Sequence, residues 1–374
     1  MIRTFTIDDL LKVAKRENNT KRSFLYVDPF QGKHVPVSPS QSMALFAELA
    51  AKVQTQYEEE KLLVIGFAET ATAIGSAAAF FNPNAVAFMT TTREEVPDAE
   101  YLYFTESHSH AAEQKLAVNG LEKWLVKADR VVFAEDEVTT GNTIAKLIRV
   151  LREKYPQLPL QFGIASILNS MPDERLQEFE AKGIPCTYIA RIPFAYRTDE
   201  VDLYRYEPLV SEPYQPCAVH IDETVIGGAW NARKIESTAN IRKACNCFVK
   251  RALEFTDDSI PSNLLVLGTE ECMFPGMLLG AALEHHGHTV HFHATTRSPI
   301  EVSRHEDYPL HERFPLCSLY DAQRRTFIYD LNAYDEVIIV TDAPHPEQGL
   351  AGLAGALEYC GNTHIRLIRW SEEV

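Results

Sequence analysis

Residues 131–143 read Val-Val-Phe-Ala-Glu-Asp-Glu-Val-Thr-Thr-Gly-Asn-Thr, and this stretch sets the fold. Its first residues are apolar, as in a strand that is buried on both faces of a parallel sheet. Two adjacent carboxylates, Glu135 and Asp136, close the apolar run, and a loop with a single glycine follows. Residues 144–151 then carry the apolar spacing of a helix. Strand, acidic pair, loop and helix in this order predict a parallel α/β sheet with a ligand at its carboxyl edge.

The loop between this strand and helix has the groups that bind a sugar phosphate. Backbone N–H groups at a helix N-terminus favour a phosphate, and threonine hydroxyls add donors. Two carboxylates just before the loop can accept hydrogen bonds from ribose hydroxyls or hold Mg²⁺. The alternative is an ordinary strand-turn-helix in which Thr143 caps the helix, which leaves the two carboxylates unexplained. The phosphate-binding candidates are Thr139, Thr140, Gly141, Asn142 and Thr143.

The segment resembles the loop that binds 5-phosphoribosyl-1-pyrophosphate (PRPP) in type I phosphoribosyltransferases. That resemblance implies the type I fold, a glycosyltransferase reaction in which PRPP loses pyrophosphate, and Mg²⁺ as cofactor. It gives Glu135 and Asp136 the catalytic and metal-binding positions, the metal contact being direct or indirect. Relatives that use 6-oxopurines place an aspartate where this chain has Thr139. The resemblance is therefore to the orotate type.

The loop after residues 62–66 is the candidate for binding pyrophosphate. Its residues Glu69, Thr70 and Ala71 join a buried strand to a small-residue helix, and the resemblance assigns pyrophosphate to the matching loop. Arg93, beyond the next strand, is a further candidate for the same anion. Without a ligand, Glu69 would simply favour a helix start and Arg93 would form a surface ion pair.

Residues 101–110 lie where this fold carries a mobile loop that closes over the reacting centre. Glu106, His108 and His110 alternate, so in an extended segment they share one face. They are candidates for general acid and base catalysis, with a metal site or solvated loop histidines as alternatives. Residues 112–127 then have a helical pattern that is interrupted at Asn119 and Gly120.

A second copy of the unit is visible later in the chain. The strand at 62–66 recurs at 264–268, Thr-Thr-Arg at 91–93 recurs at 295–297, and the strand at 131–136 recurs at 337–342. After Asp342 the chain lacks Thr-Thr-Gly and has Pro344 and Pro346, which provide no backbone donors. We expect a degenerate α/β copy without its phosphate loop, and hence one PRPP site.

The string Thr296-Arg297-Ser298-Pro299 resembles the TRSP domain that follows a phosphoribosyltransferase domain in one family. That family is associated with tellurium-resistance and stress gene clusters, where it is an expected biosynthetic enzyme. The candidates for binding the acceptor are Glu270, Glu271, Arg297 and Ser298, with a purely structural role as the alternative. The expected domains are residues 1–205 (phosphoribosyltransferase), 206–235 (connector or hood) and 236–374 (TRSP type).

Composition narrows the class of partner. The chain has 374 residues and a formal net charge of −16, which argues against nucleic-acid backbones and anionic membranes. Residues 1–10 lack the apolar core of a signal peptide, and no apolar run of about 18 residues could span a membrane. Seven cysteines without a CxxC pair indicate reduced thiols. We expect a cytoplasmic protein with small-molecule partners, and a homodimer as one option.

The preferred hypothesis is a Mg²⁺-dependent phosphoribosyltransferase in the biosynthesis of a nucleoside-like metabolite. The nucleophile is a base or another small molecule. One alternative is a regulator that binds PRPP or a nucleotide without turnover. A PRPP synthetase-like enzyme is another, because those enzymes also stack two copies of this fold.

Overall fold

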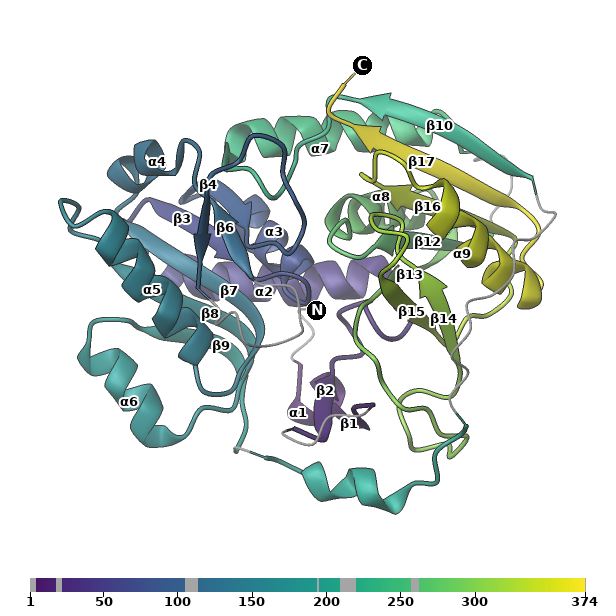
Figure 1. Ribbon diagram of the computed structural model, residues 1–374, viewed down its shortest axis with the longest axis horizontal. Coiled ribbons are helices and arrows are strands. Elements are labelled where there is room, and N and C mark those ends of the chain that lie inside the picture. Colours follow the sequence, from purple (N-terminus) through teal and green to yellow (C-terminus); the bar gives the residue numbers. More distant parts are fainter. Residues whose placement is uncertain are drawn as a thin grey trace. The chain divides into compact units, whose positions relative to one another are not determined.

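The computed structural model describes residues 5–17, 22–104, 114–193, 195–208, 220–256 and 262–373. The chain forms two compact units (Figure 1). We call Ala44–Tyr196 with Trp230–Ala244 the phosphate-loop unit, and Met1–Met43, Arg197–Ala229 and Cys245–Val374 together the C-terminal unit. Among the described residues, no helix is both long and apolar enough to cross a bilayer.

The phosphate-loop unit contains a six-stranded sheet of order β11-β4-β3-β7-β8-β9. All neighbouring strands pair in parallel except β11, which is antiparallel to β4. This confirms the predicted parallel α/β sheet. Its strands are β3 (Leu62–Gly66), β4 (Ala85–Thr90), β7 (Arg130–Val138), β8 (Phe162–Asn169), β9 (Cys186–Arg191) and β11 (Glu236–Ser237).

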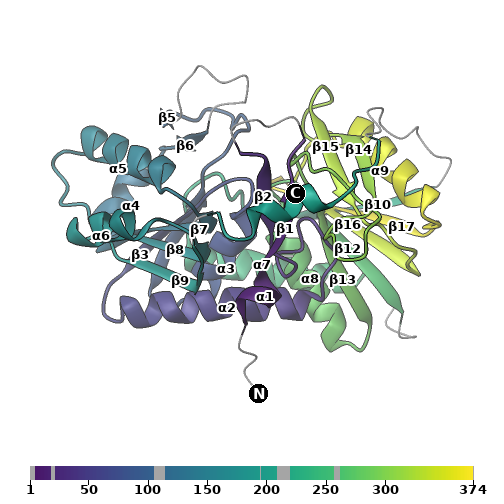
Figure 2. The ribbon, with the colours of Figure 1, turned by 90° about the horizontal axis from the view of Figure 1, so that it is seen from below.

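Helices cover both faces of this sheet (Figure 2). On one face lies α5, whose Ile144, Leu147, Ile148 and Leu151 are buried at helical spacing. On the other face α3 packs so closely that a Cβ on Gly75 would lie 2.8 Å from the Cα of Gly66. The helices are α2 (Pro39–Gln56), α3 (Thr72–Phe81), α4 (Leu121–Lys127), α5 (Asn142–Lys154) and α6 (Asp173–Ala181), and α2 belongs to this unit from Ala44 onward.

Residues 115–117 are a strand and not part of a helix, contrary to the pattern at 112–127. They form β6 (Lys115–Ala117), which pairs antiparallel with β5 (Tyr101–Tyr103). Gly120 has φ of 76°, a left-handed conformation that begins α4. The helical spacing therefore holds only from Leu121 onward.

The C-terminal unit has its own parallel sheet, of order β10-β17-β16-β12-β13. Its strands are β10 (Ile221–Gly227), β12 (Asn263–Thr269), β13 (Thr289–Thr295), β16 (Glu336–Thr341) and β17 (Ile365–Ser371), and the hairpin is β14 (Arg313–Cys317) with β15 (Arg325–Tyr329). The helices are α8 (Phe274–His285), α9 (Glu347–Tyr359) and, from Cys245 onward, α7 (Thr238–Leu253). The side chains of α9 and of the hairpin share one core with β12, β16 and β17.

The beginning of the chain packs with the C-terminal unit. The backbone of Glu17 donates to Pro299 O at 3.0 Å, and Val37 pairs with Phe292 of β13. The elements concerned are α1 (Ile7–Leu10), β1 (Lys12–Lys15) and β2 (Phe24–Val27), and the 3₁₀ helix η1 (Thr198–Leu203) also belongs here. The compact units therefore differ from the predicted limits 1–205, 206–235 and 236–374. The reason is that backbone groups of the N-terminal segment form hydrogen bonds with β13 and with the loop that follows it.

The two units share one strand order at their centres, β4-β3-β7-β8 and β13-β12-β16-β17. Each unit also has an antiparallel hairpin at the same point of the chain. The hairpin β5-β6 lies between β4 and β7 in the sequence, and β14-β15 lies between β13 and β16. Thr92 exchanges backbone hydrogen bonds with Lys115 of β6, as Thr296 does with Phe327 of β15. The Oγ1 of Thr92 accepts from Glu94 N–H, and the Oγ1 of Thr296 accepts from Ser298 N–H. These matched bonds support our proposal that the C-terminal unit is a degenerate copy.

Candidate functional site

Three loops meet at the carboxyl ends of β3, β4 and β7. Phe67 N–H, just after β3, donates to Ala134 O of β7 at 3.0 Å. Thr91, just after β4, donates its N–H to Gly66 O at 2.9 Å and accepts from Ala68 N–H at 2.9 Å through Oγ1. The structure thus brings the predicted pyrophosphate loop beside the acidic end of β7. Thr91 was not among the predicted site residues, although it lies two positions before Arg93.

The loop between β7 and α5 is shaped by Gly141. Its φ is 64°, a backbone conformation that is strained for residues with a Cβ. A Cβ at this position would also lie 2.7 Å from Cε2 of Phe179 and clash with its ring. Gly141 takes the N-cap position of α5, and no side chain caps it. The alternative in which Thr143 caps the helix is therefore wrong, because Thr143 lies inside the first turn. Apart from Asn142 N–H, which donates to Thr140 Oγ1, N–H groups of this first turn are available to an anion.

Arg175 of α6 forms hydrogen bonds with the same loop. Its Nε donates to Thr140 O at 3.0 Å, and one of its terminal nitrogens donates to Asn142 Oδ1 at 3.3 Å. Sequence reasoning missed Arg175, because nothing local connects a residue on α6 with a loop before α5. The loop itself adds a 3.4 Å hydrogen bond from Asn142 N–H to Thr140 Oγ1.

Glu135 is a perturbed carboxyl at the end of β7. Desolvation by burial, together with the nearby charges of Asp136 and Glu137, raises the pKa of Glu135 well above its ordinary value of 4.5. The third acid, Glu137, accepts from Ser170 Oγ at 3.0 Å. Ser166 stands opposite Glu135 in the register of β8, and its buried Oγ has no partner among the described residues. A polar ligand at this strand end could form hydrogen bonds with both Glu135 and Ser166.

The conformation of the predicted pyrophosphate loop depends on neighbouring residues as well as on its own. Gln114 Nε2 donates to Ala68 O at 3.0 Å, and Thr72 Oγ1 donates to Glu69 O at 3.2 Å. The peptide bond between Ala68 and Glu69 is cis, and the Glu69 side chain is buried. Thr70 is half-buried and Ala71 is buried in front of α3. Gln114 was missed because its contact depends on the hairpin that follows β4.

Arg93 is half-buried and follows the Thr92–Lys115 bridge at the end of β4. The predicted catalytic residues Glu106, His108 and His110 lie outside the described residues. Their role stays a prediction.

The acidic end of β7 suits a hard cation that is shared with a ligand. In the described part of the chain, no group of three or more His, Cys, Asp or Glu side chains is arranged to hold a metal alone. Mg²⁺ is commonly bound through one or two carboxylates together with substrate phosphates and water. Glu135 and Asp136 fit that mode, since a cation would offset both the burial and the neighbouring negative charges that raise the pKa of Glu135.

The predicted acceptor residues of the C-terminal unit form an ion-paired cluster. Glu270, which is buried with φ of 47°, accepts from Arg297 Nε at 2.7 Å and from Arg324 at 3.0 Å. Arg297 also lies 3.7 Å from Glu271. Ser298 N–H donates to Thr296 Oγ1 at 3.1 Å, and within the described ranges no hydrogen bond connects Ser298 with the ion-paired side chains. Arg324 was missed, because it comes from the turn between β14 and β15.

Comparison with known proteins agrees with this arrangement. A family model described as phosphoribosyl transferase matches residues 10–192, and a model described as the TRSP domain C-terminal to it matches residues 231–357. No curated protein matches the chain significantly.

Solved structures similar to the chain include two phosphoribosyltransferases of different specificity. Adenine phosphoribosyltransferase from Rhodothermus marinus is 13% identical with a TM-score of 0.34, covering 50% of this chain and 96% of that one. Orotate phosphoribosyltransferase from Aeropyrum pernix is 16% identical with a TM-score of 0.28, covering 48% and 87% respectively. On the strength of the two family models, the chain belongs to the phosphoribosyl transferases that carry a C-terminal TRSP domain.

Proposed function

We propose that the protein is a Mg²⁺-dependent enzyme that transfers the phosphoribosyl group of PRPP to a small nucleophile and releases pyrophosphate. The observation that carries the proposal is the strand end and loop at residues 135–143. In this segment Glu135, a carboxyl with a raised pKa, lies just before the N-terminus of α5. Gly141 fixes the turn between the two.

In this proposal two kinds of protein group bind different parts of PRPP. Backbone N–H groups and hydroxyls of residues 139–143 bind the 5-phosphate. Glu135 and Asp136 accept hydrogen bonds from the ribose hydroxyls and orient the ring. Mg²⁺, when bound by these carboxylates and the substrate, would neutralise negative charge on the pyrophosphate.

Bond cleavage occurs at C1 of the ribose. The nucleophile forms a bond to C1 as the bond from C1 to the pyrophosphate oxygen breaks, and the electron pair leaves with pyrophosphate. The loop at Glu69, Thr70 and Ala71 receives that anion, with Arg93 as a second contact. Glu106, His108 and His110 are proposed to hold or move the proton that the nucleophile loses.

The acceptor is proposed only by class. Thr139 disfavours a 6-oxopurine, because the aspartate that would assist N7 is absent at that position. Acceptor binding by Arg297 stays a prediction, because its guanidinium already pairs with Glu270 and Glu271. A nucleoside-like product and a role in tellurium resistance belong to the same proposal.

Calorimetry with PRPP and Mg²⁺, followed by a pyrophosphate-release assay with a panel of small nucleophiles, tests the function. We expect PRPP to bind and at least one nucleophile to release pyrophosphate. Asp136→Asn should reduce turnover by about a hundredfold or more, consistent with loss of a group that orients the reacting ring. The exposed Asp202 of η1 provides the control, since Asp202→Asn should change nothing.

Two outcomes count against the proposal. Absence of PRPP binding would overturn it outright. Binding without release for any nucleophile, with Asp136→Asn changing affinity alone, would favour a regulator that senses PRPP without turnover.

A further inference from the structure

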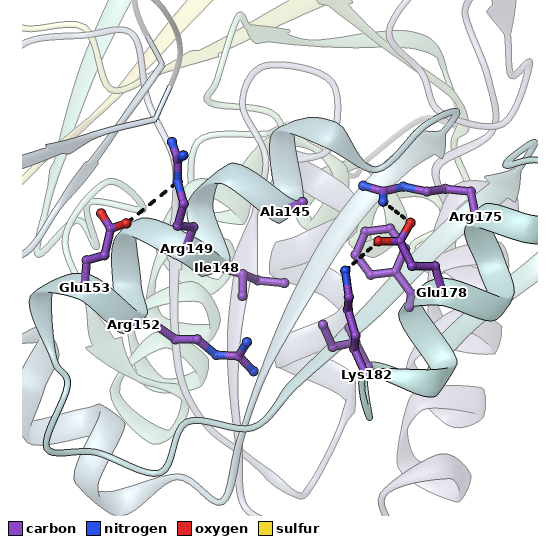
Figure 3. A pocket seen from close by; sticks show the side chains of 10 residues that line it. Ala145, Ile148, Arg149, Arg152, Glu153, Arg175, Glu178 and Lys182 are labelled. Atoms are coloured by element: carbon purple, nitrogen blue, oxygen red, sulfur yellow. Dashed lines mark hydrogen bonds and ion pairs between the residues drawn. The ribbon is translucent and has the colours of Figure 1, made fainter.

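A cavity of about 390 Å³ lies between α5 and α6 of the phosphate-loop unit (Figure 3). It is lined by side chains along α5 and α6 and by Ile184. Figure 3 shows Arg152 reaching from α5 toward α6, where Lys182 stands at the end of the helix. The cavity volume lies within the range of roughly 300–1,000 Å³ that is common for small-molecule sites.

The cavity is electropositive in an acidic protein. Four cationic side chains line it, Arg149, Arg152, Arg175 and Lys182, against the two carboxylates Glu153 and Glu178. The whole chain, by contrast, has a formal net charge of −16. The cavity therefore carries a local excess of positive charge, which would attract an anionic ligand.

The cations of the cavity are unequally paired. Glu178 accepts from both Arg175 and Lys182, at 2.5 Å each, so one carboxylate serves two cations. Glu153 lies 3.9 Å from Arg149, the limit of an ion pair. Among the described residues Arg152 has no carboxylate partner, and its guanidinium lies 5.2 Å from the ring centroid of Phe162. Arg152 is thus the side chain best placed to receive an anion.

The floor of the cavity is apolar. Ala145, Ile148, Phe179 and Ile184 line it together with the charged rim. A ligand with an apolar group could contact these side chains beside the cations, whereas an inorganic anion would contact the cations alone. Phosphate oxygens suit the planar donors of an arginine, which can form two parallel hydrogen bonds.

We propose that this cavity is a second ligand site, which binds a small phosphate-bearing molecule with a planar apolar body, of the size and chemistry of a nucleoside monophosphate. The phosphate lies against Arg152 with Arg149 or Lys182, and the planar group lies against Ile148, because the guanidinium of Arg175 already covers the ring of Phe179 at 4.6 Å from its centroid. The site is distinct from residues 135–143, since its lining begins at Ala145 and continues along α5 and α6.

The site is connected to the phosphate loop by Arg175. This arginine lines the cavity, holds Glu178, and also donates to Thr140 O and to Asn142 Oδ1. A phosphate that competes with Glu178 for the cations would alter the hold of Arg175 on the loop. Occupancy should therefore change the affinity for PRPP, and this consequence rests on the proposed function.

Calorimetry of the full chain with AMP as the probe tests the site. We expect Arg152→Ala to weaken AMP binding at least tenfold, as the loss of a hydrogen bond to a charged group implies. Arg152→Lys keeps the charge and should lose less. Lys154→Ala removes an exposed cation from the same helix outside the cavity, and should bind AMP as the wild type does.

Binding at the phosphate loop has to be separated from binding at the cavity. Thr143→Val removes a hydroxyl of the phosphate loop and should leave AMP binding at the cavity intact. The proposal is overturned if AMP does not bind, or if Thr143→Val abolishes binding while Arg152→Ala preserves it. Thermal melting of each variant shows whether it is folded.

The coupling is measured as the dissociation constant of PRPP with and without saturating AMP. A change of at least threefold that disappears in Arg152→Ala and persists in Lys154→Ala supports it. An unchanged PRPP affinity in the wild type overturns the coupling alone. If PRPP does not bind at all, the proposed function and the coupling fail together, while AMP binding to Arg152 still decides whether the cavity is a site.

Discussion

At the scale of single residues, Glu135 combines a stability cost with the binding role that we propose for it. Its pKa is raised by burial first and by Asp136 and Glu137 second. The folded chain therefore holds a proton on Glu135 at pH values where the unfolded chain, with an ordinary pKa of 4.5, has released it. Since the folded state then binds more protons, stability falls as pH rises through this window. Such residues often belong to ligand sites, where a partner repays the cost.

Glu135→Gln should therefore raise the melting temperature at pH 8 and have a smaller effect below pH 4.5, where the carboxyl is protonated in both states. It should also weaken PRPP binding, because the ionised carboxylate is the better acceptor. Melting curves and calorimetry across this pH range check both effects. Glu174→Gln, at an exposed position in the first turn of α6, serves as the control. A variant that is less stable than the wild type at pH 8 would contradict the argument.

Gly141 supplies a second prediction at this scale. Gly141→Ala should destabilise the fold by about 1–2 kcal/mol through its left-handed backbone, plus the cost of moving Phe179. Gly183 has φ of 71° and nothing within 4 Å of the position where a Cβ would lie, so Gly183→Ala isolates the backbone cost. Denaturant unfolding should show the larger loss for Gly141→Ala. Equal losses would mean that the ring contact is easily relieved.

At the scale of elements, each central strand β3 and β12 is followed by a loop that is held by a threonine at the carboxyl end of the neighbouring strand. Ala68 N–H donates to Thr91 Oγ1 at 2.9 Å, and Glu270 N–H donates to Thr295 Oγ1 at 3.1 Å. Both threonines are buried. An orphaned buried N–H costs free energy, so these hydroxyls determine the shape of the loops.

Thr91→Val should destabilise the protein by about 1–3 kcal/mol, because it leaves the Ala68 amide without an acceptor. It should also weaken the binding of pyrophosphate, measured by calorimetry. Thr91→Ser keeps the hydroxyl and should stay close to the wild type. If valine and serine behave alike, the hydrogen bond does not hold the loop.

At the scale of the whole molecule, residues 15–17 near the start of the chain contact residues 300–313 of the C-terminal unit. Glu17 pairs with Arg313 of β14 at 2.5 Å, and both side chains are nearly enclosed. Arg16 bridges to Ile300, and Tyr308 Oη accepts from Lys15 N–H at 2.9 Å. A division of the chain near residue 205 would separate these partners.

Glu17→Gln should cost about 3–5 kcal/mol, as expected when a buried ion pair loses one partner. Combining it with Arg313→Met should recover part of that loss, since the buried guanidinium that Glu17 neutralises is then removed as well; Arg325, 3.9 Å from Glu17, is the more exposed of its two cations. Denaturant unfolding of the two single variants and the double variant measures the coupling. Strictly additive losses would show that the pair contributes nothing to holding the N-terminal segment.

The sequence by itself determined the parallel α/β architecture, the strand and helix around residues 131–151, and the position of the acidic pair. It could do so because strand and helix periodicity and the order of elements are local properties of the chain. It also placed Glu69 and Arg93 on loops after neighbouring strands, since parallel strands present their carboxyl ends at one edge.

Only the tertiary structure decided which distant residues complete the site. Arg175 at Thr140, Gln114 at Ala68 and Arg324 at Glu270 are contacts between segments far apart in the chain. The helical pattern at 112–127 gave way to strand β6 for the same reason, because pairing with β5 outweighed local preference. Residues 1–43 likewise joined the C-terminal unit. Such contacts depend on how packed elements meet in space, and no local pattern encodes that.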